Sequence, residues 1–257
     1  MGKYIFILII FFSLKTFLNS NFGKGFISER VLELKLKLDS RLQKNGKVIT
    51  NVYVPKENDE TTEIDALYIT PKGLIVLENK NYSGYIFGSE ENLKWTVTLP
   101  AGRKIEKHQF YNPIRQNNTH IKYLRAYINE EIKVFSVVTF SNRGELKNIT
   151  VKSSDIYVIN HVHLYGILGK IRKNNPDLLT DSEIEAIYSK ILQLTKVSRK
   201  TKQKHVNDIK TKFDSTDICP LCGGALILRT SGNNDNGTEK HFYGCSNYPK
   251  CRYKKSV

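Results

Sequence analysis

Two acidic residues and one lysine stand close together in the sequence, and their types suit metal-dependent hydrolysis of a phosphodiester. Asp65 lies in the largely apolar stretch 63–70, and Glu78 and Lys80 end the next one, 73–80. Carboxylate oxygens bind Mg²⁺ or Mn²⁺, which neutralises phosphate charge and acidifies a water. A lysine beside them can orient or deprotonate that water, or stabilise the charge of the transition state. The alternative is a solvent-facing hairpin in which Glu78 only pairs with Lys80.

The segment 70–73, Thr-Pro-Lys-Gly, has the composition of a β-turn that joins the two stretches. If its two central residues form the loop, counting back along the hairpin sets Asp65 opposite Glu78. Side chains alternate between the faces of a strand, so Asp65, Glu78 and Lys80 then share one face. If Gly73 forms a bulge instead, the register slips by one residue and the three side chains separate.

The periodicity of apolar residues around this hairpin predicts an α/β domain over residues 25–195. Ser28 is predicted to cap the first helix, which places Glu29 in the first turn, near the positive end of the helix dipole. Helices are predicted at 25–42, 114–128 and 182–194, the last capped by Asp181, and strands at 48–54, 85–87, 93–99, 133–140 and 155–160.

Further polar residues in this region could contact a substrate or a metal. Arg115 and Gln116 stand at the start of the helix 114–128, where a phosphate group would be bound favourably. His161 and His163 have strand spacing, but no third ligand accompanies them. The pair therefore fits a polar sheet edge or a helix entry better than a metal site.

Several runs of this region, in the same order, resemble the nuclease-related (NERD) domain: 63–65, 73–88, Trp95 and 112–118. That family is similar to the PD-(D/E)xK nucleases, so the resemblance implies a restriction-endonuclease-like mixed sheet flanked by helices. It implies that Asp65 and Glu78 bind a catalytic Mg²⁺ or Mn²⁺ and that Lys80 is the catalytic lysine. It also matches Glu29 to the acid of the first helix and Gln116 to the glutamine of the helix after the sheet. The alternative is a non-catalytic DNA-binding protein that keeps the nuclease fold as a scaffold.

All four cysteines of the chain lie in the segment 217–257, where their spacing predicts a small domain held by a structural zinc. The predicted ligands are Cys219, Cys222, Cys245 and Cys251, and disulfides are the alternative. The segment resembles the four-cysteine zinc finger of type IA topoisomerases, which implies that it binds single-stranded DNA. Stacking on bases is expected from Phe242, Tyr243, Tyr248 and Tyr253, and phosphate contacts from Arg229, Lys240, Lys250, Arg252, Lys254 and Lys255.

The charge balance of the chain points to a polyanionic partner. The formal net charge is +15 at pH 7 and the pI is about 9.5. Such a balance favours nucleic acid or an anionic membrane surface and does not choose between them. The basic segment 196–216 is predicted to be a linker or a frayed helix, which either follows phosphates or only tethers the zinc domain.

Residues 4–14 form an unbroken apolar run, and residues 1–22 are predicted to be a retained transmembrane anchor. A cleaved secretory signal is the alternative, although no convincing cleavage site follows the run. Only Lys3 precedes the run and many basic residues follow it, which predicts a single-pass protein of the cell membrane with its body in the cytoplasm. A third class of function is an interaction module whose basic surface faces anionic lipid.

Overall fold

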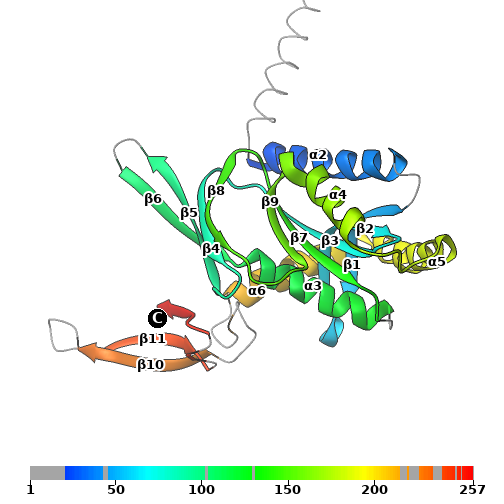
Figure 1. Ribbon diagram of the computed structural model, residues 1–257. Coiled ribbons are helices and arrows are strands. Elements are labelled where there is room, and N and C mark those ends of the chain that lie inside the picture. Colours follow the sequence, from blue (N-terminus) through cyan, green and yellow to red (C-terminus); the bar gives the residue numbers. More distant parts are fainter. Residues whose placement is uncertain are drawn as a thin grey trace, which may run out of the picture. The chain divides into compact units, whose positions relative to one another are not determined.

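The computed structural model describes residues 21–42, 46–101, 104–128, 131–214, 219, 226–233, 239–246, 248–249 and 251–256 (Figure 1). The chain divides into two compact units. The first comprises Met1–Lys56 and Thr61–Lys196, and the second Glu57–Glu60 and Val197–Val257.

A mixed five-stranded sheet forms the centre of the first unit, as the sequence predicted. Its order is β1-β2-β3-β7-β9, with the first three strands antiparallel and β3, β7 and β9 parallel. The strands are β1 (Lys47–Pro55), β2 (Thr61–Thr70), β3 (Gly73–Lys80), β7 (Val134–Phe140) and β9 (Ile156–Asn160). Every residue of β7 is buried, which explains its continuous run of apolar and small residues.

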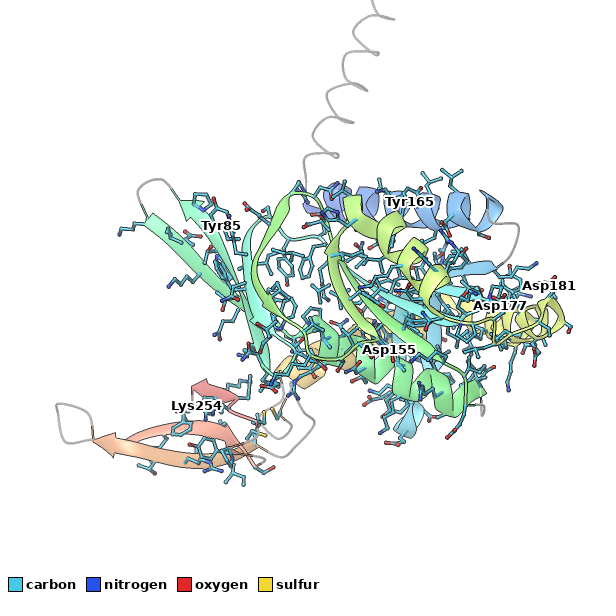
Figure 2. All side chains as sticks on the ribbon, in the orientation of Figure 1. Tyr85, Asp155, Tyr165, Asp177, Asp181 and Lys254 are labelled. Atoms are coloured by element: carbon cyan, nitrogen blue, oxygen red, sulfur yellow. The ribbon has the colours of Figure 1, made fainter. Side chains whose placement is uncertain are left out.

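Helices cover both faces of this sheet, and side chains fill the space between them (Figures 1 and 2). On one face lie α2 (Asn21–Leu42) and α4 (Leu164–Asn174), and on the other α3 (Pro113–Ile128) and α5 (Asp181–Leu192). Leu32 and Leu36 are four residues apart, so both point from α2 into the core, where they are almost fully buried. Burial of each such side chain contributes about 1.5–3 kcal/mol.

A second sheet of the first unit has the order β6-β5-β4-β8. Its strands are β4 (Gly84–Ser89), β5 (Lys94–Ala101), β6 (Lys104–Tyr111) and β8 (Gly144–Thr150). Trp95 is fully buried between the two sheets, with its ring 6.1 Å from that of Phe140 and nearly parallel to it. The indole N–H donates to the Ser89 carbonyl at 2.9 Å, so the buried polar atom is satisfied.

Two predicted helix starts were wrong. The first helix begins at Asn21, so Ser28 lies within α2 and its hydroxyl is 3.4 Å from the side-chain oxygen of Asn79 instead of capping the helix. The cap of α5 is Thr180, one residue before Asp181, because Thr180 and Glu183 form a reciprocal capping box. The two histidines at 161 and 163 form a short 3₁₀ helix, η2 (His161–His163), which leads into α4 and confirms the predicted helix entry.

Three elements of the first unit were not predicted, namely β6, β8 and α4, and η3 (Gln193–Thr195) follows α5. The residues of β6 are mostly exposed, so this strand has no apolar period. The helix α4 does have one, with Leu164, Leu168 and Ile171 buried, but it is short and contains two glycines, which are unfavourable in a helix.

The second unit contains η1 (Glu57–Asp59), the helix α6 (Arg199–Asp214) and a three-stranded antiparallel sheet (Figure 1). The strands are β10 (Leu226–Asn233), β11 (Glu239–Cys245) and β12 (Lys254–Ser256). The basic segment 196–216 is therefore helical over most of its length.

Residues 1–20, which make up most of the predicted anchor, lie outside the described ranges. Among the helices that the structure describes, none is long and apolar enough to span a membrane.

The register of the β2–β3 hairpin is the one expected for a two-residue loop. Thr70 pairs with Gly73 and the pairing continues without a slip to Ala66 and Leu77, which confirms the register predicted without a bulge. Gly73 has φ +119°, and a Cβ atom at this position would lie 2.3 Å from the carbonyl oxygen of Lys133. Glycine is therefore required where the hairpin meets the start of β7.

We expect Gly73→Ala to lower the free energy of unfolding of the first unit by about 3 kcal/mol, because the new methyl group combines a disfavoured φ with a backbone clash. Gly166→Ala is the matched control, since its Cβ would meet nothing within 4 Å in α4, and it should stabilise by about 0.5–1 kcal/mol. Urea unfolding followed by the fluorescence of Trp95, the single tryptophan of the chain, measures both changes. Equal effects of the two substitutions would contradict the prediction.

Candidate active site and zinc ribbon

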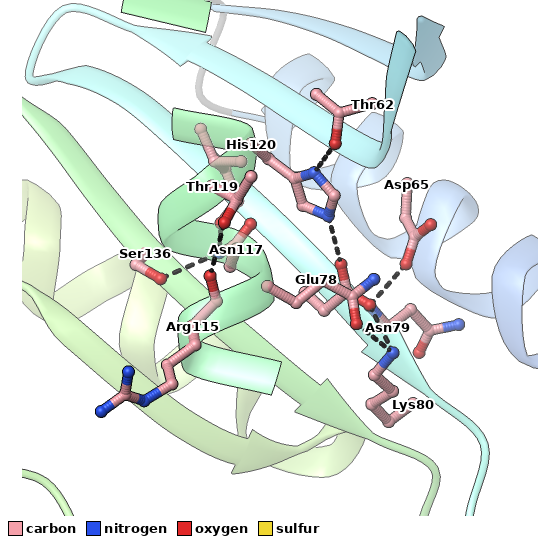
Figure 3. A network of polar contacts seen from close by, with 12 residues as sticks. Thr62, Asp65, Glu78, Asn79, Lys80, Arg115, Asn117, Thr119, His120 and Ser136 are labelled. Atoms are coloured by element: carbon pink, nitrogen blue, oxygen red, sulfur yellow. Dashed lines mark hydrogen bonds and ion pairs between the residues drawn. The ribbon is translucent and has the colours of Figure 1, made fainter. Parts of the chain in front are cut away.

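The carboxylate of Glu78 is buried in the first unit and held from two sides (Figure 3). Lys80 Nζ lies 2.7 Å from Glu78 Oε1, and His120 Nε2 lies 3.0 Å from Oε2. Lys80 also donates a hydrogen bond of 2.8 Å to the side-chain oxygen of Gln116. The structure thus brings together three residues that the sequence had singled out and adds His120 from α3.

His120 links the hairpin to the beginning of β2. The hydroxyl of Thr62 lies 2.6 Å from His120 Nδ1, so both ring nitrogens of this buried side chain have partners (Figure 3). His120 was not identified as a site residue from the sequence. Its place one turn after Gln116 was the available signal, because residues four apart lie on the same face of a helix.

The electrostatics of the group favour a charged pair. Burial opposes ionisation of Glu78, but Lys80 and the hydrogen bond from His120 outweigh it and lower the pKa of Glu78. Burial also opposes the charge of Lys80, and here Glu78 and Asp65 outweigh it and raise the pKa of the lysine. Lys80 is therefore an ammonium group at neutral pH.

Asp65 approaches this group from β2. Its Oδ2 accepts a hydrogen bond of 2.7 Å from the backbone N–H of Asn79, beyond the last backbone pair of the hairpin (Figure 3). The neighbouring position of β1, Asn51, has φ +54° and interrupts the β1–β2 pairing. Burial and the nearby Glu78 carboxylate raise the pKa of Asp65 well above its usual value, and the Asn79 N–H counteracts them only in part.

A cavity of about 300 Å³ opens beside Asp65. Its charged lining residues are four acids and one base: Glu29, Glu33, Glu63, Asp65 and Arg30. Tyr53 donates a hydrogen bond of 2.7 Å to Glu63 Oε1. Partial burial, followed by the charge of Glu63, raises the pKa of Glu29. Glu29 of α2 thus lines the same cavity as Asp65, and Glu63 is a further member that the sequence did not identify as a site residue.

Oxygen donors around Asp65 fit a hard divalent cation. The negative charge of Glu78 is close enough to Asp65 to oppose its ionisation. A divalent cation bound by both carboxylates would remove this repulsion. Within the described residues, however, no three carboxylate oxygens converge, since the only group of three metal-binding side chains found there is made of cysteines. Arg115 does not join the site, because its guanidinium bonds the carbonyls of Glu91 and Asn92.

The other face of β3 carries a second polar group, centred on Asn79. Its side-chain oxygen lies 2.8 Å from His161 Nε2 and 3.3 Å from the hydroxyl of Thr139. His161 is buried, and burial, together with the charge of Lys35, lowers its pKa to about 4. The backbone N–H of Asn79 therefore donates to Asp65, while the side chain of Asn79 lies on the α2–α4 side of the sheet.

Three of the four predicted zinc ligands converge in the second unit. The sulfur atoms of Cys219, Cys245 and Cys251 all lie within 4.8 Å of one another, and those of Cys219 and Cys251 are 3.6 Å apart. A tetrahedral zinc with bonds of about 2.3 Å separates two sulfur ligands by roughly 3.8 Å, whereas a disulfide bond measures about 2.05 Å. The cluster fits a structural zinc, and Cys222 lies outside the described residues.

A basic and aromatic pocket of about 210 Å³ lies beside the cysteines in the second unit. The guanidinium of Arg229 stands 5.8 Å from the ring centre of Tyr248, and Lys254 Nζ stands 5.0 Å from that of Phe242. Arg252 and Tyr253 also line this pocket. Tyr243 and Lys255 do not line it, and Lys240 and Lys250 have side chains outside the described residues.

Two family models match the chain. The nuclease-related domain matches residues 24–141, and the topoisomerase DNA-binding C4 zinc finger matches residues 216–257.

Relatives are found for both parts of the chain. An uncharacterised protein of Bacillus anthracis is 34% identical over 192 residues, which is 74% of this chain and 85% of the relative. DNA topoisomerase 1 of Methanocaldococcus jannaschii is 50% identical over 40 residues, 16% of this chain and 4% of that protein. DNA topoisomerase 1 of Helicobacter pylori is 26% identical over 205 residues, 79% of this chain and 22% of that protein. No solved structure matches.

We expect His161 to make the first unit sensitive to mild acid. Its pKa is about 4 in the folded state and about 6.5 in the unfolded chain, so stability falls as the pH drops from about 6.5 towards 4. Between pH 7 and 4.5 the free energy of unfolding should fall by about 2 kcal/mol less in His161→Gln than in the natural protein, because only the natural protein gains a proton on this histidine when it unfolds. The carboxylates titrate alike in both proteins, so their contribution cancels in the comparison. Urea unfolding followed by Trp95 fluorescence measures this difference. Identical pH dependence in the two proteins would refute the assignment.

Proposed function

The chain belongs to the nuclease-related domain family, and on this basis we propose that it is a divalent-metal-dependent nuclease that acts on DNA. The observation that supports this most is the buried ion pair of Glu78 and Lys80 near Asp65, which itself lines an acidic cavity. A purely structural pair would be expensive to bury, whereas an active site requires these charges.

In the proposed reaction Asp65 and Glu78 hold Mg²⁺ or Mn²⁺, which supplies charge neutralisation and an acidified water. Lys80 is held as an ammonium by Glu78, so it orients the attacking water or stabilises phosphate charge rather than removing a proton. Gln116 fixes the Lys80 ammonium through its hydrogen bond. Glu29 lines the same cavity as Asp65, so it would bind the cation through a water or orient that water.

The zinc ribbon is proposed to hold the DNA strand. Its pocket combines cations with aromatic rings, so phosphates and unstacked bases both find partners there. Unstacked bases occur in single-stranded DNA, which is the expected ligand. The helix α6 carries many lysines and adds a non-specific attraction for phosphates.

Attachment to the cell membrane through residues 1–22 is part of the proposal. The support is the apolar run 4–14 and the excess of basic residues after it, which favours a single pass with the body in the cytoplasm.

One observation favours a second function, that of a non-catalytic DNA-binding protein. Both oxygens of Glu78 already have protein partners, Lys80 and His120, and no third carboxylate converges with it among the described residues. A nuclease fold that had become a scaffold could keep this network for its stability alone.

Cleavage of circular single- and double-stranded DNA with Mg²⁺ or Mn²⁺ separates the two functions. We expect Asp65→Asn and Lys80→Met to lower the rate by about 10²–10³-fold, since each removes charge at the reacting phosphate. Gln116→Ala should lower the cleavage rate less, by about tenfold, because Lys80 loses one hydrogen bond but keeps its ion pair with Glu78. Glu145→Gln, which replaces an exposed acid of β8, is the control and should cleave DNA at the rate of the natural protein. Equal rates in all variants with DNA binding retained would leave the scaffold function.

The zinc ribbon is tested by metal content and DNA affinity. Cys245→Ser should lose its stoichiometric zinc and its binding of single-stranded DNA while the Trp95 fluorescence of the first unit stays unchanged. Tyr248→Ala should keep the zinc and lose about 1–3 kcal/mol of binding, the loss expected for one stacked base. Full DNA affinity after loss of zinc would contradict the assignment.

A further inference from the structure

Most of the exposed large hydrophobic side chains of the first unit gather on one surface, formed by α2 and the neighbouring η2 and α4. They are Val31, Leu34, Leu38, Val162 and Tyr165, which we call the α2–α4 patch. Leu34 is 66% exposed, Val162 60% and Leu38 50%. Such side chains scattered singly would need no explanation, but a group on adjacent helices marks a surface that meets an apolar partner.

The two parts of the patch are held side by side. Lys35 of α2 donates a hydrogen bond of 2.7 Å to the carbonyl of His161 and stands 5.5 Å from the ring centre of Tyr165. Arg172 of α4 pairs with the buried Asp39 of α2 at 2.7 Å. Figure 2 shows Tyr165 at these two helices. The patch is therefore a fixed surface of the fold.

Basic side chains are interleaved with the apolar ones. Lys37 is exposed on the same side of α2 as Leu34, because it lies three residues after it. Arg30, four residues before Leu34, is also exposed, at the border between the patch and the acidic cavity that it helps to line. Both side chains pair with Glu33. The two helices together carry more Lys and Arg than Asp and Glu. Exposed apolar side chains with Lys and Arg around them suit the surface of an anionic membrane, whereas the centre of a protein interface is depleted of lysine.

The chain itself brings this surface to a membrane. The apolar run 4–14 precedes α2 by residues 15–20, which span at most roughly 20–25 Å even when fully extended. Any bilayer that takes up the run therefore lies within that distance of the first residue of α2. At so short a tether length even a weak surface contact is populated.

We propose that the α2–α4 patch lies on the anionic lipid surface of the membrane and fixes the orientation of the first unit on it. This inference rests on the membrane attachment proposed above. The apolar side chains enter the headgroup region, and the lysines and arginines around them contact the acidic lipids.

The test uses the full chain in vesicles of phosphatidylcholine and phosphatidylglycerol (3:1) that contain a lipid with a photoreactive group in its acyl chain. Labelled peptides are identified by mass spectrometry. We expect labelling of residues 31–38, and we expect Leu34→Glu combined with Leu38→Glu to reduce it about tenfold. Ile105→Glu, which replaces an equally exposed side chain on β6, is the matched control and should change nothing.

The outcomes distinguish this surface from the anchor. Labelling of residues 4–14 without residues 31–38 would overturn the proposed surface and keep the attachment. Labelling of neither would overturn both. Cross-linking of two chains through α2 without lipid would show that the patch is a dimer interface, which also overturns the proposal. Weaker labelling of residues 31–38 in pure phosphatidylcholine, with residues 4–14 unaffected, would support the role of the basic side chains.

Discussion

A single buried negative charge determines much of the architecture of the first unit. The Glu78 carboxylate is out of contact with water, so it requires cationic or hydrogen-bonding partners, and it takes Lys80 from its own strand β3 and His120 from α3. His120 and Gln116 reach it directly or through Lys80 only if α3 has one particular rotation. That rotation is set by Asn112, whose side chain accepts from the N–H of Ile114 at the helix start and donates to carbonyls of the β4–β5 turn.

The strand β3 serves both faces of the sheet at once. Glu78 and Lys80 point to α3, while the side chain of Asn79 between them points to α2 and η2 and its N–H holds Asp65. The alternation of side chains along a strand makes this possible, and the interruption at Asn51 lets Asp65 turn towards the cavity. The acidic cavity and the ion pair are thus coupled through one backbone amide.

Local sequence signals predicted the parts of the fold that depend on local chemistry. The Thr-Pro-Lys-Gly turn determined the hairpin register, and the apolar run of β7 predicted a buried strand. The helix start predicted at Ser28 was wrong: α2 begins at Asn21, and the partner of Ser28 is Asn79, fifty-one residues away, which no local signal reveals. Glu63 was missed for the same reason, because nothing in the sequence around it reveals the cavity that it lines in the folded chain. The place of His120 one turn after Gln116 suggested a shared helix face, but the Glu78 carboxylate that it contacts lies forty-two residues away.

The helix α2 has two roles on opposite sides. Glu29, Leu32 and Glu33 line the acidic cavity, and Leu34 and Leu38 belong to the exposed α2–α4 patch. An α-helix with its side chains is only about 10–12 Å across. A first unit that rests on the membrane through this patch would therefore hold its cavity one helix width from the lipid. If its body also lies in the cytoplasm, as proposed, such a protein would encounter DNA only in a thin layer along the membrane, and DNA deeper in the cell would be out of its reach.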